Sequence, residues 1–255
     1  MEYKNIIVGE QDMIGKITFN RPPLNVLNIE MMKEINAALE DMGKRNLKAV
    51  VLNANGKAFS AGVDVSDHIA DKVGEMIRVF HDIFNNMRKL GVPFIALVEG
   101  AALGGGCEVA AFCDIILASD RAKFGQPEIM VGVFPPVACA IFPQVFGPRK
   151  GIELVLTGDT IRADEAKDLG LVNHVFPADS FQAEADKFIK EKIATKSSVV
   201  LKLTKKAFLE GCCQRYEQAI KPIERIYLDE MMKTKDANEG LGAFLEKRQP
   251  VWKNE

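Results

Sequence analysis

The sequence lacks the cysteine patterns and charge imbalance that mark several specialised classes of protein. Its five cysteines are an odd number without CxxC spacing, and two of them are adjacent, which argues against a disulfide framework and a structural zinc site. The 33 basic and 35 acidic residues leave a net charge of −2, so nothing indicates a nucleic-acid or membrane surface. We therefore expect reduced thiols, no metal and no nucleic-acid partner.

Targeting and membrane segments are also missing from the pattern. The first residues lead directly into a strand-like segment at 6–8, without the basic start and long apolar run of a signal peptide. The most apolar stretch, 92–112, is interrupted by Glu99, Glu108 and several glycines, which excludes a membrane span. These features predict a cytoplasmic protein that does not enter a membrane.

Several common catalytic motifs are absent as well. The sequence contains neither the GxGxxG of a Rossmann fold nor a P-loop, and no HExxH metal motif occurs. Ser60 lacks the GxSxG frame of a hydrolase nucleophile. Nucleotide, metal and serine-nucleophile chemistry therefore find no support.

What is present is an alternation of strand-like and helical patterns, followed by an almost wholly helical region. The pattern predicts strands at 14–19, 49–52, 93–98, 114–118 and 171–176, and helices at 29–42, 69–90, 107–113, 148–157, 163–169, 180–194, 198–210, 214–234 and 238–247. This order favours an α/β fold. We expect a catalytic core over 1–195 and a helical C-terminal region over 196–255.

A run of three glycines opens an apolar helical stretch that carries a carboxylate. Gly104, Gly105 and Gly106 follow a strand-like segment and precede the helix that holds Glu108. A helix start leaves backbone N–H groups unpaired, and glycine lets a ligand approach them, so this turn suits a developing oxyanion. Taken alone, the run favours a tight turn without a ligand, and Glu108 alone favours a surface carboxylate facing the helix dipole.

A second carboxylate and a second loop of small residues strengthen the functional interpretation. Glu128 follows Pro127 in a turn, and it flanks the same buried-type strand as Glu108. The segment 57–65 contains Ser60-Ala61-Gly62, whose small side chains suit a close-packed loop that supplies another backbone N–H group. Two carboxylates beside such donors predict acid/base chemistry on an activated acyl group.

Four motifs in the same order resemble the crotonase (enoyl-CoA hydratase/isomerase) family over essentially the whole chain. They are the segments 59–65, 102–108, 113–116 and 124–128, and the shorter segments 20–23 and 243–248 are similar too. The resemblance implies an α/β fold, a crotonase-like spiral of ββα units with a C-terminal helical trimerisation region. It also implies an acyl-CoA substrate and a homotrimer or a hexamer of two trimers. CoA is part of that substrate, so no separate cofactor is expected.

The resemblance further implies roles for single residues. Glu108 and Glu128 match the two catalytic glutamates that hold a water molecule, Glu108 as the base that delivers it and Glu128 as the acid that donates the α-proton. The backbone N–H groups of Val63 and Gly105 match the oxyanion hole. Residues expected to contact the substrate or its CoA moiety are Ala61, Val63, Asp64, Val65, Gly104, Phe244 and Lys247.

The chain departs from the family after Glu128. A typical hydratase has a glycine-rich stretch there, whereas this chain has Phe134, Pro135 and Pro136 followed by small residues, which stiffens and reshapes the expected wall of the acyl pocket. This wall resembles that of family hydratases acting on a cyclic dienoyl-CoA of anaerobic aromatic degradation, cyclohexa-1,5-dienecarbonyl-CoA.

Three alternatives stay open at this stage. The altered wall is also compatible with a neutral loop variant in a general short-chain enoyl-CoA hydratase of fatty-acid β-oxidation. A double-bond isomerase is a second alternative, although the presence of both Glu108 and Glu128 favours hydration. A third is a binding homologue without catalytic activity.

Overall fold

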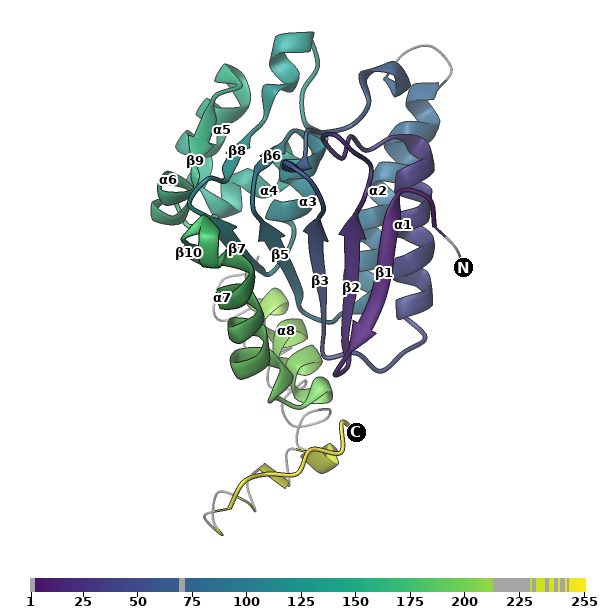
Figure 1. The fold of residues 1–255 in the computed structure, drawn as a ribbon, viewed down its shortest axis with the longest axis vertical. Helices are drawn as coiled ribbons and strands as arrows, with labels where there is room; N and C mark the ends of the chain where they lie inside the picture. Colours follow the sequence, from purple (N-terminus) through teal and green to yellow (C-terminus); the bar gives the residue numbers. More distant parts are fainter. Residues whose placement is uncertain are drawn as a thin grey trace.

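Two β-sheets surrounded by helices form the protein (Figure 1). The computed structural model describes residues 3–68, 72–212, 230, 233–236, 239–240, 243, 246 and 248–255. The strands are β1 Ile6–Gln11, β2 Ile14–Phe19, β3 Ala49–Ala54, β4 Ala58–Ser60, β5 Phe94–Val98, β6 Ala101–Leu103, β7 Ile115–Ser119, β8 Lys123–Gly125, β9 Thr160–Arg162 and β10 His174–Phe176. The α-helices are α1 Ile29–Met42, α2 Val73–Leu90, α3 Gly105–Ala111, α4 Pro136–Val145, α5 Gly147–Thr157, α6 Ala163–Asp168, α7 Phe181–Phe188 and α8 Ser198–Cys212.

The chain winds as a repeated unit of two strands and a helix. The larger sheet has the order β1-β2-β3-β5-β7-β10 and the smaller one the order β4-β6-β8-β9. Strands β3, β5 and β7 pair in parallel in the larger sheet, and each is followed at once by β4, β6 or β8 of the smaller sheet, which are also parallel. A helical segment closes each turn, namely α2, α3 and then the 3₁₀ helix η3 (Pro127–Val131) with α4. The predicted spiral of ββα units is confirmed.

The two faces of the larger sheet have different neighbours. Side chains alternate along a strand, so Val50 and Leu52 of β3 face one side and Val51 the other. The first side belongs to a large apolar core shared with α1, α2 and α3. The second side packs against α7 and the following π-helical turn η5 (Ile189–Ala194) in a smaller apolar cluster. Glu108 therefore lies on the side with the larger core.

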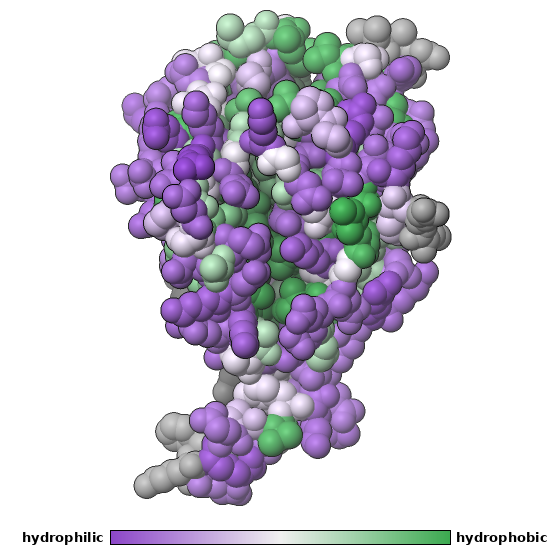
Figure 2. Space-filling view, in the orientation of Figure 1, coloured by the Kyte–Doolittle hydropathy of each residue, from purple (hydrophilic) through white to green (hydrophobic). Residues whose placement is uncertain are grey.

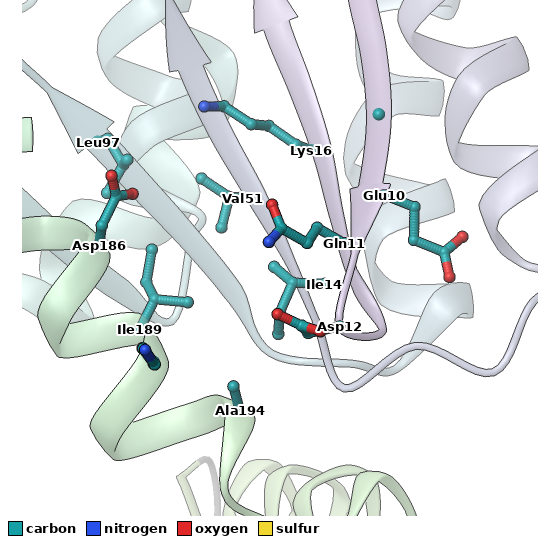
Figure 3. Close-up of a pocket in the computed structure, with 12 residues that line it drawn as sticks. Glu10, Gln11, Asp12, Ile14, Lys16, Val51, Leu97, Asp186, Ile189 and Ala194 are labelled. Carbon is teal, nitrogen blue, oxygen red and sulfur yellow. The ribbon is translucent and has the colours of Figure 1, made fainter.

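A cavity of about 570 Å³ lies on the second side of the sheet. Figure 3 shows Lys16 and Val51 on the strands opposite Asp186 and Ile189 of α7 and η5. Figure 2, in the orientation of Figure 1, shows hydrophobic residues on the floor of a hollow between hydrophilic residues on either side. This cavity is separated from Glu108 by the sheet and includes none of the predicted site residues.

Most of the predicted helices are confirmed. Helix α1 begins after Asn28, whose side-chain oxygen accepts a hydrogen bond from the Met31 N–H at 3.0 Å, as its sequence predicts. Helix α2 ends at Gly91 in the left-handed conformation (φ 70°). The predicted helices at 148–157, 163–169, 180–194 and 198–210 correspond to α5, α6, α7 with η5, and α8.

The C-terminal predictions are only partly covered by the structure. The helices predicted at 214–234 and 238–247 lie mostly outside the described residues, and the division of the chain near residue 195 stays a prediction. Within the part of the chain that the structure describes, no helix combines the length and apolar character needed to cross a bilayer.

Candidate active site

Glu108 is a buried carboxylate held between two helices. It lies in the first turn of α3 with 2% of its surface exposed. Its Oε1 accepts a hydrogen bond from the Ala138 N–H, in the first turn of α4, at 2.7 Å. Burial raises the pKa of Glu108 to about 7, the negative charge of Glu128 adds to this, and the N–H groups of Ala138 and Val137 oppose it. The interpretation of Glu108 as a surface carboxylate, which the sequence alone allowed, is therefore wrong.

Glu128 approaches the same place from the other side. It lies in η3, a short 3₁₀ helix rather than the open turn predicted from its sequence. Burial also raises its pKa to about 7, and its own backbone N–H is the group that opposes the rise. Its Oε2 is buried, and none of the described residues hydrogen-bonds it. Two carboxyl groups that change protonation near neutral pH are suited to acid/base catalysis.

The glycine run makes room for these contacts. Gly104 has φ 51°, and a Cβ added there would lie 2.6 Å from Oε1 of Glu128. A Cβ added at Gly105 would lie 2.7 Å from Cγ2 of Val63. A side chain at either position would force its neighbour to shift, and the positive φ of Gly104 would add backbone strain, so both positions favour glycine. The run thus places the start of α3 directly against Glu128 and the Val63 loop.

Two backbone N–H groups beside this turn are free to bind an oxyanion. The loop that carries Val63 is fixed by a bridge to Leu27, in which the flanking Gly62 O and Asp64 N–H form the hydrogen bonds. The N–H of Val63 therefore has no backbone partner among the described residues, and neither has the N–H of Gly105 at the start of α3. Gly62 lies against both, since a Cβ added there would be 3.6 Å from the Gly105 nitrogen.

Ser60 and Ala61 shape the loop that carries Val63. Ser60 is fully buried, and its hydroxyl accepts a hydrogen bond from the Gly62 N–H at 3.2 Å. The Ala61 N–H donates to the Leu24 carbonyl at 3.0 Å. The first bond lies within the loop, and the second ties the loop to the segment before α1. The hydroxyl of Ser60 acts as a structural acceptor in this arrangement, which agrees with the exclusion of a serine nucleophile.

The remaining predicted contacts of the CoA moiety are more dispersed. Asp64 caps the short 3₁₀ helix η1 (Val65–Asp67) through the Ser66 N–H and forms an ion pair with Arg21 at 3.8 Å. Val65 is 62% exposed. The predictions for Phe244 and Lys247 lie outside the described residues.

The predicted acyl-pocket wall is the approach to a helix. Phe134 is exposed, Pro135 is buried and is the N-cap of α4, and Pro136 is its first residue. Sequence reasoning treated this segment as a wall and missed the helix, although two successive prolines before small residues are a helix-start signal. This helix matters for the site, because the Ala138 N–H in its first turn donates a hydrogen bond to Glu108.

One further polar residue was also missed. Gln126 is fully buried between β8 and η3, and neither atom of its side-chain amide has a hydrogen-bond partner among the described residues. It lies two positions before Glu128. Its burial carries no signal in a single sequence, because glutamine is ordinarily an exposed residue. Among the described residues, no three His, Cys, Asp or Glu side chains gather as metal ligands would.

Comparisons with known proteins agree with this geometry. A sequence profile described as "Enoyl-CoA hydratase/isomerase" matches residues 9–255. Cyclohexa-1,5-dienecarbonyl-CoA hydratase of Thauera aromatica is 35% identical over 240 residues, which cover 94% of this chain and 92% of that protein. A probable enoyl-CoA hydratase of Rhizobium meliloti (strain 1021) is 37% identical over 266 residues, which cover 100% of both chains. A crystal structure of enoyl-CoA hydratase from Bacillus anthracis superimposes with a TM-score of 0.92 at 31% identity and covers 99% of this chain and 100% of that one. The chain therefore belongs to the crotonase family, the enoyl-CoA hydratases and isomerases.

Proposed function

We propose that this protein adds water to the conjugated double bond of an acyl-CoA thioester. One observation carries the proposal: Glu108 and Glu128, each with its pKa raised to about 7, lie at a helix start where the Val63 and Gly105 N–H groups have no backbone partner in the described part of the chain. A family member with only one such carboxyl would lack either the base or the acid that hydration needs. The arrangement supplies both, next to a place where enolate charge is stabilised.

The mechanism follows from the positions of these groups. The thioester oxygen accepts hydrogen bonds from the N–H groups of Val63 and Gly105, which draws electrons from the conjugated double bond. Glu108 removes a proton from a water molecule as the oxygen of that water molecule bonds to the β-carbon. Glu128 gives its proton to the α-carbon, and the enolate returns to a thioester. The proton now on Glu108 restores the acid by transfer to Glu128, so one water molecule is consumed per turnover.

We further propose that the acyl group is a cyclic diene, as in cyclohexa-1,5-dienecarbonyl-CoA. Pro135 and Pro136 fix the start of α4 beside Glu108, and a rigid wall suits a ring better than a flexible chain. The relative from Thauera aromatica carries that substrate in its name. The alternative is a general short-chain enoyl-CoA hydratase, which the probable enoyl-CoA hydratase of Rhizobium meliloti favours with 37% identity.

The proposed assembly and location follow the family resemblance. We infer a homotrimer, alone or paired as a hexamer, that works in the cytoplasm and uses no cofactor beyond the CoA of its substrate. Light scattering of the purified protein tests the assembly directly. A monomer at micromolar concentration would contradict it.

The decisive experiment compares cyclohexa-1,5-dienecarbonyl-CoA with crotonyl-CoA. We expect kcat/KM to be higher for the cyclic diene, with loss of the conjugated absorbance and a product heavier by one water molecule. Higher kcat/KM for crotonyl-CoA would leave the hydratase function standing and make the general enzyme the better description. A product of unchanged mass would identify an isomerase, and no reaction with either thioester would favour a binding protein.

A further inference from the structure

Two side chains from different parts of the chain fill the space beside Gly105. A Cβ added at Gly105 would lie 2.7 Å from Cγ2 of Val63, and it would lie 3.1 and 3.3 Å from Cζ and Cε2 of Phe80. The Val63 side chain and the edge of the Phe80 ring therefore approach the same point next to the Gly105 Cα. Val63 and Gly105 carry the two N–H groups without backbone partners in the described chain, so Phe80 packs against the residues of the expected oxyanion hole.

Phe80 belongs to an aromatic column that runs along α3. The rings of Phe80 and Phe84, one turn apart in α2, have centroids 5.0 Å apart at 89°, and those of Phe84 and Phe112 are 5.0 Å apart at 70°. Such edge-to-face contacts are favourable. Phe112 is the C-cap of α3, and Gly105 is its first residue. Helix α2 thus contacts both ends of this short helix, which limits how far α3 can shift.

Helix α2 is itself tied to α1 next to Phe80. The side-chain amide of Asn36 in α1 donates to the Val79 carbonyl at 2.8 Å and accepts from the Asn86 side chain at 2.9 Å. Phe80 is 2% exposed and lies in the larger apolar core. A closely packed ring on a helix fixed in this way has little freedom to move. Phe80 has no polar group, so it can affect the site only through packing.

We propose that Phe80 is a positioning residue that keeps the oxyanion hole in the geometry that polarises the thioester carbonyl. Glycine at position 105 lets a ligand approach the N–H, but it also gives the backbone more freedom to shift. The Phe80 ring fills the space into which this turn would otherwise relax. The inference rests on the proposed hydratase function for the reaction that the oxyanion hole serves. Polarisation of a bound thioester is measured without turnover, so the two can be tested separately.

The test is the infrared carbonyl stretch of a bound thioester. Butyryl-CoA labelled with ¹³C at its carbonyl has no double bond to hydrate, so its stretch reports hydrogen bonding to the carbonyl oxygen. In the natural protein we expect a lower frequency than for butyryl-CoA in solution. In Phe80→Leu, which removes the ring edge beside Gly105, about half of this lowering should be lost and kcat should fall about 10-fold, since loss of a whole donor costs about 10²- to 10³-fold. KM should change little.

Phe80→Met is a milder variant of the same test. The methionine side chain is long enough to fill the space beside Gly105, but it is flexible and holds the turn less firmly. The carbonyl stretch and kcat should therefore lie between those of the natural protein and Phe80→Leu. Natural values of both quantities in the two variants would overturn the proposal. If Phe80→Leu does not fold, Phe80→Met alone decides, and natural values there would overturn the proposal too.

Phe181→Leu is the matched control. Phe181 is also 2% exposed, and it lies in α7 within the smaller apolar cluster on the other side of the sheet. The exchange removes the same atoms, so it should lower the urea midpoint of unfolding as Phe80→Leu does. The carbonyl stretch and kcat should keep their natural values. If Phe181→Leu changed them as much as Phe80→Leu, loss of stability would explain both variants and the proposal would be overturned.

Hydration and the carbonyl stretch distinguish this inference from the proposed function. If the stretch responds to position 80 but neither cyclohexa-1,5-dienecarbonyl-CoA nor crotonyl-CoA is hydrated, the hydratase function fails and the role of Phe80 stands. If hydration is found while the stretch and kcat do not respond to position 80, the function stands and this inference fails. A stretch in the natural protein equal to that of butyryl-CoA in solution would also overturn the inference, because the turn would then polarise no carbonyl.

Discussion

Helices α3 and α4 begin on either side of the glutamate pair, and their sequences achieve this in opposite ways. Helix α3 begins with glycines, whose missing side chains let Glu128 and Val63 come within contact of the backbone. Helix α4 begins with prolines, which fix the backbone and remove one donor. The first helix leaves the Gly105 N–H without a backbone partner among the described residues, and the second donates the Ala138 N–H to Glu108.

This difference gives two carboxyl groups of one chemical type two different surroundings. Glu108 is buried and Glu128 half-buried, and burial is the main cause that raises the pKa of each to about 7. The Ala138 N–H of α4 donates to Glu108, which favours its ionised form and opposes the effect of its deeper burial. The two carboxyl groups therefore differ in their surroundings, and part of that difference originates in the backbone of α4 rather than in the glutamates.

Removing the carboxylate that α4 holds should have the largest effect. In Glu108→Gln the amide keeps the shape and retains an oxygen for the Ala138 N–H, but it cannot take a proton from water. We expect kcat to fall by about 10²- to 10⁴-fold, the usual contribution of a general base. Steady-state kinetics measure this, and calorimetric binding of a CoA ester should be retained. Turnover within a few fold of the natural enzyme would show that Glu108 is not the base.

The glycine side of the comparison is tested by Gly104→Ala. The new Cβ would lie 2.6 Å from Oε1 of Glu128, and φ 51° is unfavourable for alanine. We expect a loss of about 1–3 kcal/mol in the free energy of unfolding from backbone strain, and about a 100-fold fall in kcat/KM from displacement of Glu128. Urea unfolding and kinetics measure the two effects.

Gly74→Ala is the matched control for this substitution. A Cβ added at Gly74, in the first turn of α2, meets nothing within 4 Å. It should leave kcat/KM unchanged and stability unchanged or slightly higher. If the two alanine variants behaved alike, the close approach of Gly104 to Glu128 would have no functional meaning.

The sequence predicts the glycine side of the site better than the proline side. The glycine run and Glu108 follow from a strong local pattern, and the asparagine cap of α1 does too. The strands β4, β6 and β8 have only three residues each, too few for a periodic pattern, so the smaller sheet was missed. Helix α4 was not predicted, because its first turn has no polar cap, and the residues at its start were interpreted only as a pocket wall. The Ala138 N–H donates a hydrogen bond to Glu108, thirty residues earlier in the chain. No local pattern encodes such a tertiary contact.

Buried glutamates also predict a pH-dependent stability. Because the pKa of Glu108 is raised from 4.5 to about 7 on folding, the folded state binds more protons than the unfolded state between these values. Its contribution to the free energy of unfolding is therefore present at low pH and is lost as pH rises towards 7. We expect the difference between the natural protein and Glu108→Gln to change by about 1–3 kcal/mol across this window. Urea unfolding of both proteins at several pH values measures this change. If the natural protein became more stable relative to Glu108→Gln as pH rose, the assigned sign would be wrong.

The start of helix α1 is the reference for the starts of α3 and α4, and a substitution there should have the smallest effect. Its free N–H groups are used by side chains, since Met31 donates to Asn28 and Ile29 donates to Asp67, both at 3.0 Å. Such a start stabilises the fold and serves no ligand. Asn28→Ala should therefore reduce the free energy of unfolding by about 1 kcal/mol and leave kcat/KM and its pH profile unchanged, as measured by urea unfolding and kinetics. If instead the pH profile of kcat/KM shifted in Asn28→Ala, the start of α1 would also affect the glutamate pair. The effect would then not be specific to α3 and α4.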